Sequence, residues 1–191
     1  YHSRQSDVYV DLRTNKVTNK DESKDEKWRI NLIETGDKTQ TGGRIARMKE
    51  HLNETFMVTY GDGVANIDIK ALLGFHRSHG KMGTVTAVLP PSRFGSLKID
   101  SSNSVTKCAE KPNDGEAFIN SGFFVFEPEI FNYLSTDDDC ILERDPLENL
   151  AREGQLAAFH HRGFWQCMDT VRDINHLNDM WENNQAPWKK W

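Results

Sequence analysis

The sequence has 191 residues and a formal net charge of −5 at pH 7. This length suits a single domain with one hydrophobic core, which we expect to span residues 1–191. No basic cluster stands out, so neither a nucleic-acid surface nor a polybasic membrane contact is expected. The three cysteines are widely spaced and form no CxxC pair, which argues against a disulfide framework and favours a reducing cytoplasm. No apolar run reaches the length that crosses a membrane.

A long hairpin is predicted at about residues 6–35. Apolar and polar residues alternate at 8–12 and again at 28–32, which indicates two half-buried strands. Residues 15–27, NKVTNKDESKDEK, are polar and rich in charge, so they have too little apolar surface to offset the entropy of ordering them. We interpret them as the connection between the two strands.

Beyond the hairpin, extended and helical patterns alternate. Residues 36–43, GDKTQTGG, form a loop rich in glycine and threonine, after which Ile45, Met48 and Leu52 mark one face of a short helix. Strands are predicted at 55–60, 83–89, 94–99, 104–110, 117–126 and 156–161, and helices at 67–79, 128–134, 145–153 and 170–182. This alternation predicts an α/β fold of three layers, with helices on the faces of a mixed, mostly parallel sheet.

The turn after the strand at 55–60 is a candidate site. Residues 57–68 read MVTYGDGVANID, and Asp-Gly between apolar stretches often closes a hairpin. Here the apolar residues continue from Ile69 to His76 at helical spacing, which favours a strand-to-helix turn. In α/β proteins, backbone amides and a carboxylate at such turns reach a phosphate or its metal. Asp62 is therefore a candidate for this role.

Two further segments carry polar residues where strands end or are interrupted. AEKP places Glu110 and Lys111 side by side, although a solvated strand end is the more usual explanation of such a pair. In FINSGFFVF, residues Asn120 to Gly122 interrupt a buried strand, which indicates either a β-bulge or the close approach of a ligand. Asparagine offers both a donor and an acceptor suited to sugar hydroxyls.

The segment GFWQCMDT ends in Asp169, just before the last predicted helix. Taken alone, this residue is most simply the N-cap of that helix. Two carboxylates from separate turns can instead hold one Mg²⁺, which prefers oxygen ligands and bridges to substrate phosphates. Paired with Asp62, Asp169 becomes the second candidate metal ligand.

Taken in this order, the segments resemble those of the sugar-nucleotide pyrophosphorylases, a family of nucleotidyltransferases. The resemblance is carried by LIETGDKTQTGGRI, FMVTYGDGVANIDI, LPPSRFGSLKI, AEKPNDGEAFINSGFFVFEPEIF, GFWQCMDTVRD and the closing APWKKW. The TG…TGGR segment after a long hairpin favours the cytidylyl branch over thymidylyl or uridylyl relatives. The fold implied is the Rossmann-like nucleotidyltransferase fold.

The resemblance also implies an activity, which is Mg²⁺-dependent transfer of a nucleotidyl group from CTP to glucose 1-phosphate, giving CDP-glucose and pyrophosphate. Asp62, Lys111 and Asp169 would be catalytic, with Asp62 and Asp169 holding the metal. The implied partners are a sugar 1-phosphate, a nucleoside triphosphate and further copies of the chain in a homo-oligomer. The implied substrate-binding residues are Thr41, Arg44, Gly61, Gly95, Glu110, Lys111, Asn120 and Gly122.

One departure from the family is large. Its glycine-rich phosphate loop, of the GGxGTRL type, and its lysine-proline segment do not occur in this sequence, so we expect an N-terminally incomplete fold. Without the amides of that loop, the chain should bind CTP poorly and turn over slowly or not at all.

Three alternatives follow from the same segments. One is a non-catalytic module for sugar-phosphate binding or assembly, and another is a thymidylyl-, uridylyl- or mannose-1-phosphate nucleotidyltransferase. A glycosyltransferase that uses a nucleotide sugar is the weakest, because such enzymes often carry two acids at the metal turn and GDG supplies one.

Overall fold

The computed structural model describes residues 8–11, 16–19, 30–90, 96–99, 101–109 and 118–190. The chain divides into two compact units, Tyr1–Glu34 and Thr35–Trp191. The organisation of residues 1–191 as one domain stays a prediction.

In the first unit, β1 (Val8–Asp11) and β2 (Lys16–Asn19) form an antiparallel pair in which Val10 lies opposite Val17. Two predictions about this hairpin are wrong. Residues 16–19 form a strand rather than part of the connection, because the β-branched Val17 and Thr18 favour extended backbone despite the charged residues around them. Residues 30–32, expected in the second strand, have no regular structure, and Leu32 is 94% exposed.

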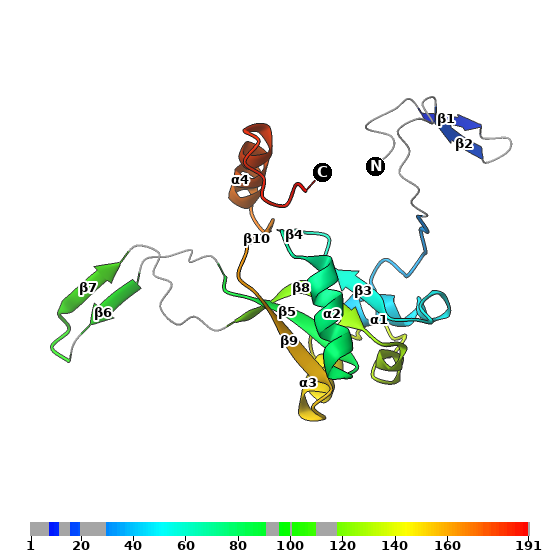
Figure 1. Ribbon diagram of the computed structural model, residues 1–191, viewed down its shortest axis with the longest axis horizontal. Helices are drawn as coiled ribbons and strands as arrows, with labels where there is room; N and C mark the ends of the chain where they lie inside the picture. The colour runs from blue at the N-terminus through cyan, green and yellow to red at the C-terminus, as the bar shows by residue number, and fades with distance from the viewer. Residues whose placement is uncertain are drawn as a thin grey trace. The chain divides into compact units, whose positions relative to one another are not determined.

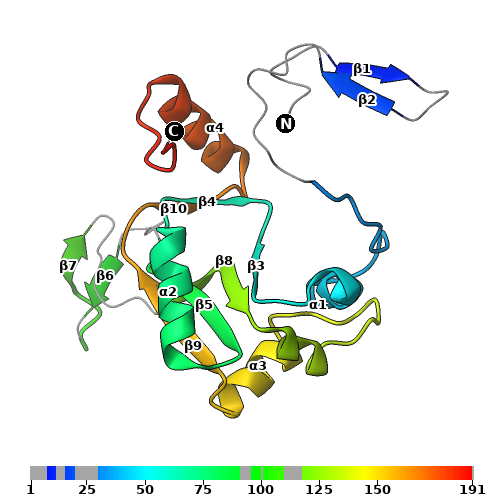
Figure 2. The ribbon, with the colours of Figure 1, turned by 45° about the vertical axis from the view of Figure 1, so that its right-hand side comes forward.

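The second unit is built on a four-stranded sheet. Its strands follow the order β3 (Phe56–Thr59), β8 (Ile119–Phe126), β5 (Gly83–Val88) and β9 (Leu156–His161). Strand β8 is antiparallel to both neighbours, whereas β5 and β9 are parallel, so three of the four strands run in one direction (Figure 2). This arrangement confirms the predicted mixed, mostly parallel sheet.

One face of the sheet carries the main hydrophobic core. Phe56 lies opposite Phe126 across the β3–β8 pair, and the rings of Phe124 and Phe126 stack at 5.4 Å. Two helices cover this face: α1 (Thr41–Ala46) contributes Ile45 and α3 (Asp145–Arg152) contributes Leu150 to the same cluster. Burial of these side chains is the largest favourable contribution to folding of this unit.

The opposite face is covered by α2 (Ile69–His79), which contacts β5, β8 and β9 (Figure 1). Leu72 and His76 are one turn apart on this helix and each is 1% exposed. The helix begins at Asp68, whose carboxylate accepts a hydrogen bond from the N–H of Ala71 at 3.0 Å, and ends at Gly80 with a left-handed φ of 65°. Helices on both faces confirm the three-layer prediction.

Several further elements are short. Strands β6 (Ser96–Ile99) and β7 (Val105–Ala109) form an antiparallel pair, as do β4 (Gly63–Ala65) and β10 (Trp165–Cys167). The sequence pattern predicted neither β4 nor β10. The 3₁₀ helix η3 (Lys49–His51) precedes β3 in the sequence, and η4 (Pro128–Asn132) follows β8 and replaces most of the helix predicted at 128–134.

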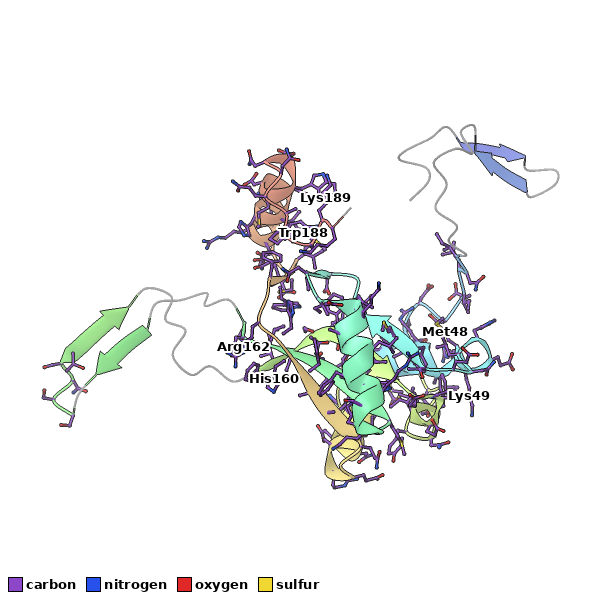
Figure 3. All side chains as sticks on the ribbon, in the orientation of Figure 1. Met48, Lys49, His160, Arg162, Trp188 and Lys189 are labelled. Carbon is purple, nitrogen blue, oxygen red and sulfur yellow. The ribbon has the colours of Figure 1, made fainter. Side chains whose placement is uncertain are left out.

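Helix α4 (Val171–Glu182) and the segment after it form a small aromatic cluster. Trp188 stacks on Phe164 at 5.1 Å, and the ammonium of Lys189 lies 4.4 Å from the ring centre of Trp181 (Figure 3). The closing APWKKW segment thus contacts α4 through Lys189 and the residue before β10 through Trp188. Among the described residues, no helix combines the length and the apolar character needed to cross a membrane.

Candidate functional site

The β4–β10 pair brings together the two turns that carry the candidate metal ligands. Gly63 lies opposite Cys167, and the N–H of Met168 donates to the carbonyl of Asp62 at 2.8 Å. Asp62 immediately precedes β4, and Asp169 lies two residues after β10. Two residues 107 positions apart in the sequence therefore stand on adjacent backbone turns, as Figures 1 and 2 both show for β4 and β10.

The N-cap alternative for Asp169 is wrong. Helix α4 begins at Thr170, whose hydroxyl accepts a hydrogen bond from the N–H of Asp173, while the Asp173 carboxylate accepts one from the N–H of Thr170. This reciprocal capping box fulfils the role that the sequence suggested for Asp169. Asp169 is exposed, and its Oδ2 accepts a hydrogen bond from the thiol of Cys167 at 3.2 Å.

A pocket of about 770 Å³ opens beside Asp62. It is lined by α1, by the end of β3 with the turn after it, and by the turn before α3, so its residues come from the sheet and from the layer that holds α1 and α3. Four of the predicted site residues line it, and three further polar residues were not predicted, Thr59, Tyr60 and Glu143. The lining residues are Thr41, Arg44, Ile45, Val58, Thr59, Tyr60, Gly61, Asp62, Leu142 and Glu143.

Thr41 and Arg44 are held by the first turn of α1 and the loop before it. The hydroxyl of Thr41 donates to Glu143 Oε2 at 2.7 Å and accepts from the N–H of Leu142 at 3.0 Å. The guanidinium of Arg44 donates to the hydroxyl of Thr35 at 3.0 Å, which steadies a side chain that is otherwise exposed in the pocket lining. An arginine in this position can bind an anion through its remaining N–H groups.

Tyr60 also lines the pocket, where charged and polar side chains surround its hydroxyl. Its hydroxyl donates to Glu143 Oε1 and accepts from Asn120 Nδ2 at 3.1 Å. Burial raises the pKa of Tyr60 well above its ordinary value, and the nearby Glu143 and Asp62 carboxylates raise it further. Tyr60 is therefore a neutral hydrogen-bonding group in the pocket at any physiological pH.

Asn120 and Gly122 lie at an irregularity in β8. Between β5 and β8 the register shifts, because Val85 pairs with Phe124 but Ala87 pairs with Asn120. Gly122 has φ of 79°, and its N–H donates to the side-chain oxygen of Asn120 at 2.8 Å. The bulge alternative is thus confirmed for this segment, while sugar binding by Asn120 and Gly122 stays a prediction.

Three predicted site residues, Gly95, Glu110 and Lys111, lie outside the described residues, so their roles also stay predictions.

In the described part of the chain, no group of three or more His, Cys, Asp or Glu side chains could enclose a metal. Mg²⁺ commonly binds proteins through one or two carboxylates and completes its shell with water and substrate phosphates. The donor pair Asp62 and Asp169 fits that kind of site.

Comparison with protein families matches residues 6–187 to the nucleotidyl transferase model. Glucose-1-phosphate cytidylyltransferase of Salmonella typhi is 48% identical over 168 residues, a match that covers 87% of this chain and 65% of the relative. Probable glucose-1-phosphate cytidylyltransferase of Bacillus subtilis is 41% identical over 167 residues with the same coverage. This chain thus spans about 65% of the length of these relatives.

Among solved structures, a putative glucose-1-phosphate thymidylyltransferase from Bacillus anthracis in complex with a sucrose superposes with a TM-score of 0.56. It is 16% identical, and the match covers 82% of this chain and 63% of that one. HddC from Yersinia pseudotuberculosis superposes with a TM-score of 0.54 at 24% identity, covering 74% and 62%. At these identities the likeness concerns the fold.

Proposed function

This chain belongs to the nucleotidyl transferase family, and from that premise we propose that it serves Mg²⁺-dependent transfer of a nucleotidyl group from CTP to glucose 1-phosphate. The products would be CDP-glucose and pyrophosphate. The choice of base and sugar is supported by the 48% and 41% identity to glucose-1-phosphate cytidylyltransferases. The reaction as a whole is a proposal, because the chain spans about 65% of those relatives.

The observation that carries the proposal is that Asp62, which lines the pocket, and Asp169 stand on adjacent backbone turns. The pairing of β4 with β10 sets the two turns side by side, and Asp62 lines the pocket itself. In this proposal both carboxylates bind Mg²⁺, which when bound supplies positive charge against the charge that develops on the phosphates. Catalysis of such a transfer consists mostly of alignment and charge neutralisation, since the protein forms no covalent bond.

The remaining roles concern the chain's own side chains. An oxygen of the sugar phosphate would attack the α-phosphorus in line, and pyrophosphate would leave. Arg44 and Thr41 would bind the nucleotide, and Asn120, which lies on β8, would bind sugar hydroxyls. Lys111 would contact the sugar phosphate, and Glu110 the sugar, as the resemblance implies; the backbone at Gly61, Gly95 and Gly122 would admit the substrates.

The experiment is a transfer assay with two separate readouts. The chain is incubated with CTP, glucose 1-phosphate and Mg²⁺, and both pyrophosphate release and CDP-glucose formation are measured; glucose 1-phosphate binding is measured by calorimetry in parallel. CTP should be used in preference to TTP, UTP and GTP. Binding of glucose 1-phosphate without release of pyrophosphate would favour the non-catalytic module, and absence of both would reject the proposal.

Two further parts of the proposal concern the protein's setting. A homo-oligomer is expected from the resemblance, and light scattering on the purified chain would test it. A cytoplasmic location is supported by the odd number and wide spacing of the cysteines.

A further inference from the structure

One continuous chain of hydrogen bonds crosses the wall of the pocket. Asn120 Nδ2 donates to the hydroxyl of Tyr60, and that hydroxyl donates to Glu143 Oε1. On the other side, the N–H of Leu142 donates to the hydroxyl of Thr41, which donates to Glu143 Oε2. Each hydroxyl accepts one hydrogen bond and donates one, and both donate to the same carboxylate.

Glu143 is well placed to be the centre of this network. Its neighbour Leu142 is 0% exposed and belongs to the hydrophobic core, so the packing of Leu142 holds the backbone that carries Glu143 in place. The carbonyl of Leu142 also accepts from the N–H of Leu147 at 3.1 Å, which ties the turn to α3. A carboxylate on such an anchored backbone can hold two hydroxyls in place because only its side-chain torsions remain to be ordered.

The network also determines how Asn120 is oriented. Its side-chain oxygen accepts from the N–H of Gly122 at 2.8 Å, and its nitrogen donates to Tyr60. An amide has two N–H donors and two acceptor lone pairs, so one of each remains for a ligand once these two bonds are made. The direction of that donor depends on Tyr60, whose own hydroxyl depends on Glu143.

From this arrangement we infer that Glu143 is a positioning residue for sugar recognition, acting on Asn120 through Tyr60 while it holds Thr41 on the nucleotide side. This inference rests on the proposed function, because it assumes that Asn120 contacts the sugar. Glu143 itself is 83 residues from Tyr60 and 102 from Thr41 in the sequence, and it joins the two sides of the pocket through one carboxylate.

The test replaces Glu143 with glutamine, which has nearly the same shape. A carboxylate accepts from both hydroxyls, whereas an amide presents one oxygen and one NH₂, so one of the two hydroxyls must turn away. We expect Glu143→Gln to weaken glucose 1-phosphate binding about 10-fold by calorimetry, the upper range for one broken hydrogen bond. Tyr60→Phe should have a similar effect, because it removes the hydroxyl through which Glu143 acts.

The double variant Tyr60→Phe/Glu143→Gln separates a shared route from two independent ones. If Glu143 acts through Tyr60, the double variant binds glucose 1-phosphate about as weakly as the weaker single variant. Independent contributions would multiply to about 100-fold. A purely structural role would lower the melting temperature and leave the affinity of the folded protein unchanged, so both quantities are measured for every variant.

The chain contains a matched control pair. The hydroxyl of Tyr133 donates to Glu153 Oε2 at 2.5 Å, and neither residue lines the pocket. Tyr133→Phe therefore removes a tyrosine–glutamate hydrogen bond elsewhere and should leave the affinity as it is. Equal affinities of wild type and Glu143→Gln, or multiplying losses in the double variant, would overturn the inference alone, because the proposed function would still be upheld by a wild-type chain that binds glucose 1-phosphate and releases pyrophosphate. A wild-type chain that does not bind glucose 1-phosphate overturns both.

Discussion

The ring of Tyr60 lies against the backbone of Gly122, where a Cβ atom would come within 2.3 Å of Tyr60 Cδ2. The N–H of Tyr60 also donates to the carbonyl of Gly122 at 2.9 Å. Gly122 has φ of 79°, a left-handed conformation that residues with a Cβ rarely adopt. Glycine is therefore required twice at this position, once by the backbone and once by the neighbouring ring.

Gly122→Ala should destabilise the fold by about 3 kcal/mol, because left-handed strain adds to overpacking against Tyr60. Gly154→Ala is the control, since Gly154 has φ of 70° but no atom within 4 Å of the position that a Cβ would occupy. It should cost only the strain, about 1 kcal/mol. Urea denaturation measures both free energies of unfolding. Equal losses in the two variants would show that the contact with Tyr60 contributes nothing.

Asp62→Asn and Asp169→Asn should each weaken divalent-metal binding by at least about 100-fold, the upper end of the cost of changes beside metal ligands. Each change replaces a charged oxygen ligand with a neutral amide at nearly constant shape. Binding of Mn²⁺ in place of Mg²⁺, followed by water-proton relaxation, measures this without relying on turnover. In an active enzyme the same variants should lose most Mg²⁺-dependent transfer.

Asp68→Asn provides the matched control for the metal experiment. Asp68 is the N-cap of α2, and asparagine caps helices about as well as aspartate, so the fold should be retained. Its Mn²⁺ affinity should equal that of the wild type. If Asp62→Asn bound Mn²⁺ as tightly as Asp68→Asn, the assignment of Asp62 as a metal ligand would be wrong.

The sequence predicted the elements whose apolar faces are buried. Strands β3, β5, β8 and β9 and helices α2 and α3 were all located within about two residues, because each presents a regular apolar pattern to the core. β4 and β10 were missed because a three-residue strand has too few positions to show alternation. Those two strands exist through their pairing with each other, which is a tertiary contact.

The residues of the candidate site were likewise predicted only in part. Asp62, Gly61, Thr41 and Arg44 were identified and do line one pocket. Glu143 was not identified, because its segment, ILERDP, reads as an ordinary helix start and its partners lie far away in the sequence. Only the fold brings such a residue to the pocket, so no local pattern could have predicted it.

The guanidinium of Arg47 holds two loops together. It donates to the carbonyl of Thr35 at 2.7 Å, the hydroxyl of Thr39 at 2.6 Å and the carbonyl of Thr136 at 2.7 Å, and it pairs with Asp138 at 2.9 Å. Arg47→Ala should lower the free energy of unfolding by about 2 kcal/mol, because several acceptors lose a charged donor at once.

Asp138→Asn is the informative comparison for Arg47. The Asp138 side chain is 63% exposed, and exposed ion pairs contribute little to stability because water and salt screen them. Arg47 should therefore matter more through the carbonyls it binds than through its charged partner. Chemical denaturation at low and high salt tests this: the effect of Arg47→Ala should persist at high salt, and an effect of Asp138→Asn as large as that of Arg47→Ala would contradict it.

A second hydrogen-bonded network lies between α2 and the sheet. The N–H of Lys81 donates to His79 Nδ1 at 3.0 Å, so that nitrogen accepts and the proton of a neutral His79 is on Nε2, 2.8 Å from the hydroxyl of Thr84. Thr84 also lies 2.8 Å from His76 Nδ1, and His76 Nε2 lies 3.1 Å from Glu127. Protonation of His79 would place two N–H groups against each other at Lys81.

The free energy of unfolding should therefore fall as the pH is lowered through the range below 6.5. Burial lowers the pKa of His79 from its ordinary value of 6.5, and the neighbouring His76 and Lys81 lower it further. Below pH 6.5, His79 binds a proton more readily in the unfolded chain than in the folded chain. The contribution of neutral His79 to the free energy of unfolding is therefore fully present above pH 6.5 and is lost as the pH falls through the folded pKa. His79→Gln should flatten the pH dependence measured by urea denaturation, whereas His176→Gln, exposed on α4, should retain it. Parallel pH profiles for wild type and His79→Gln would show that His79 is not the responsible group.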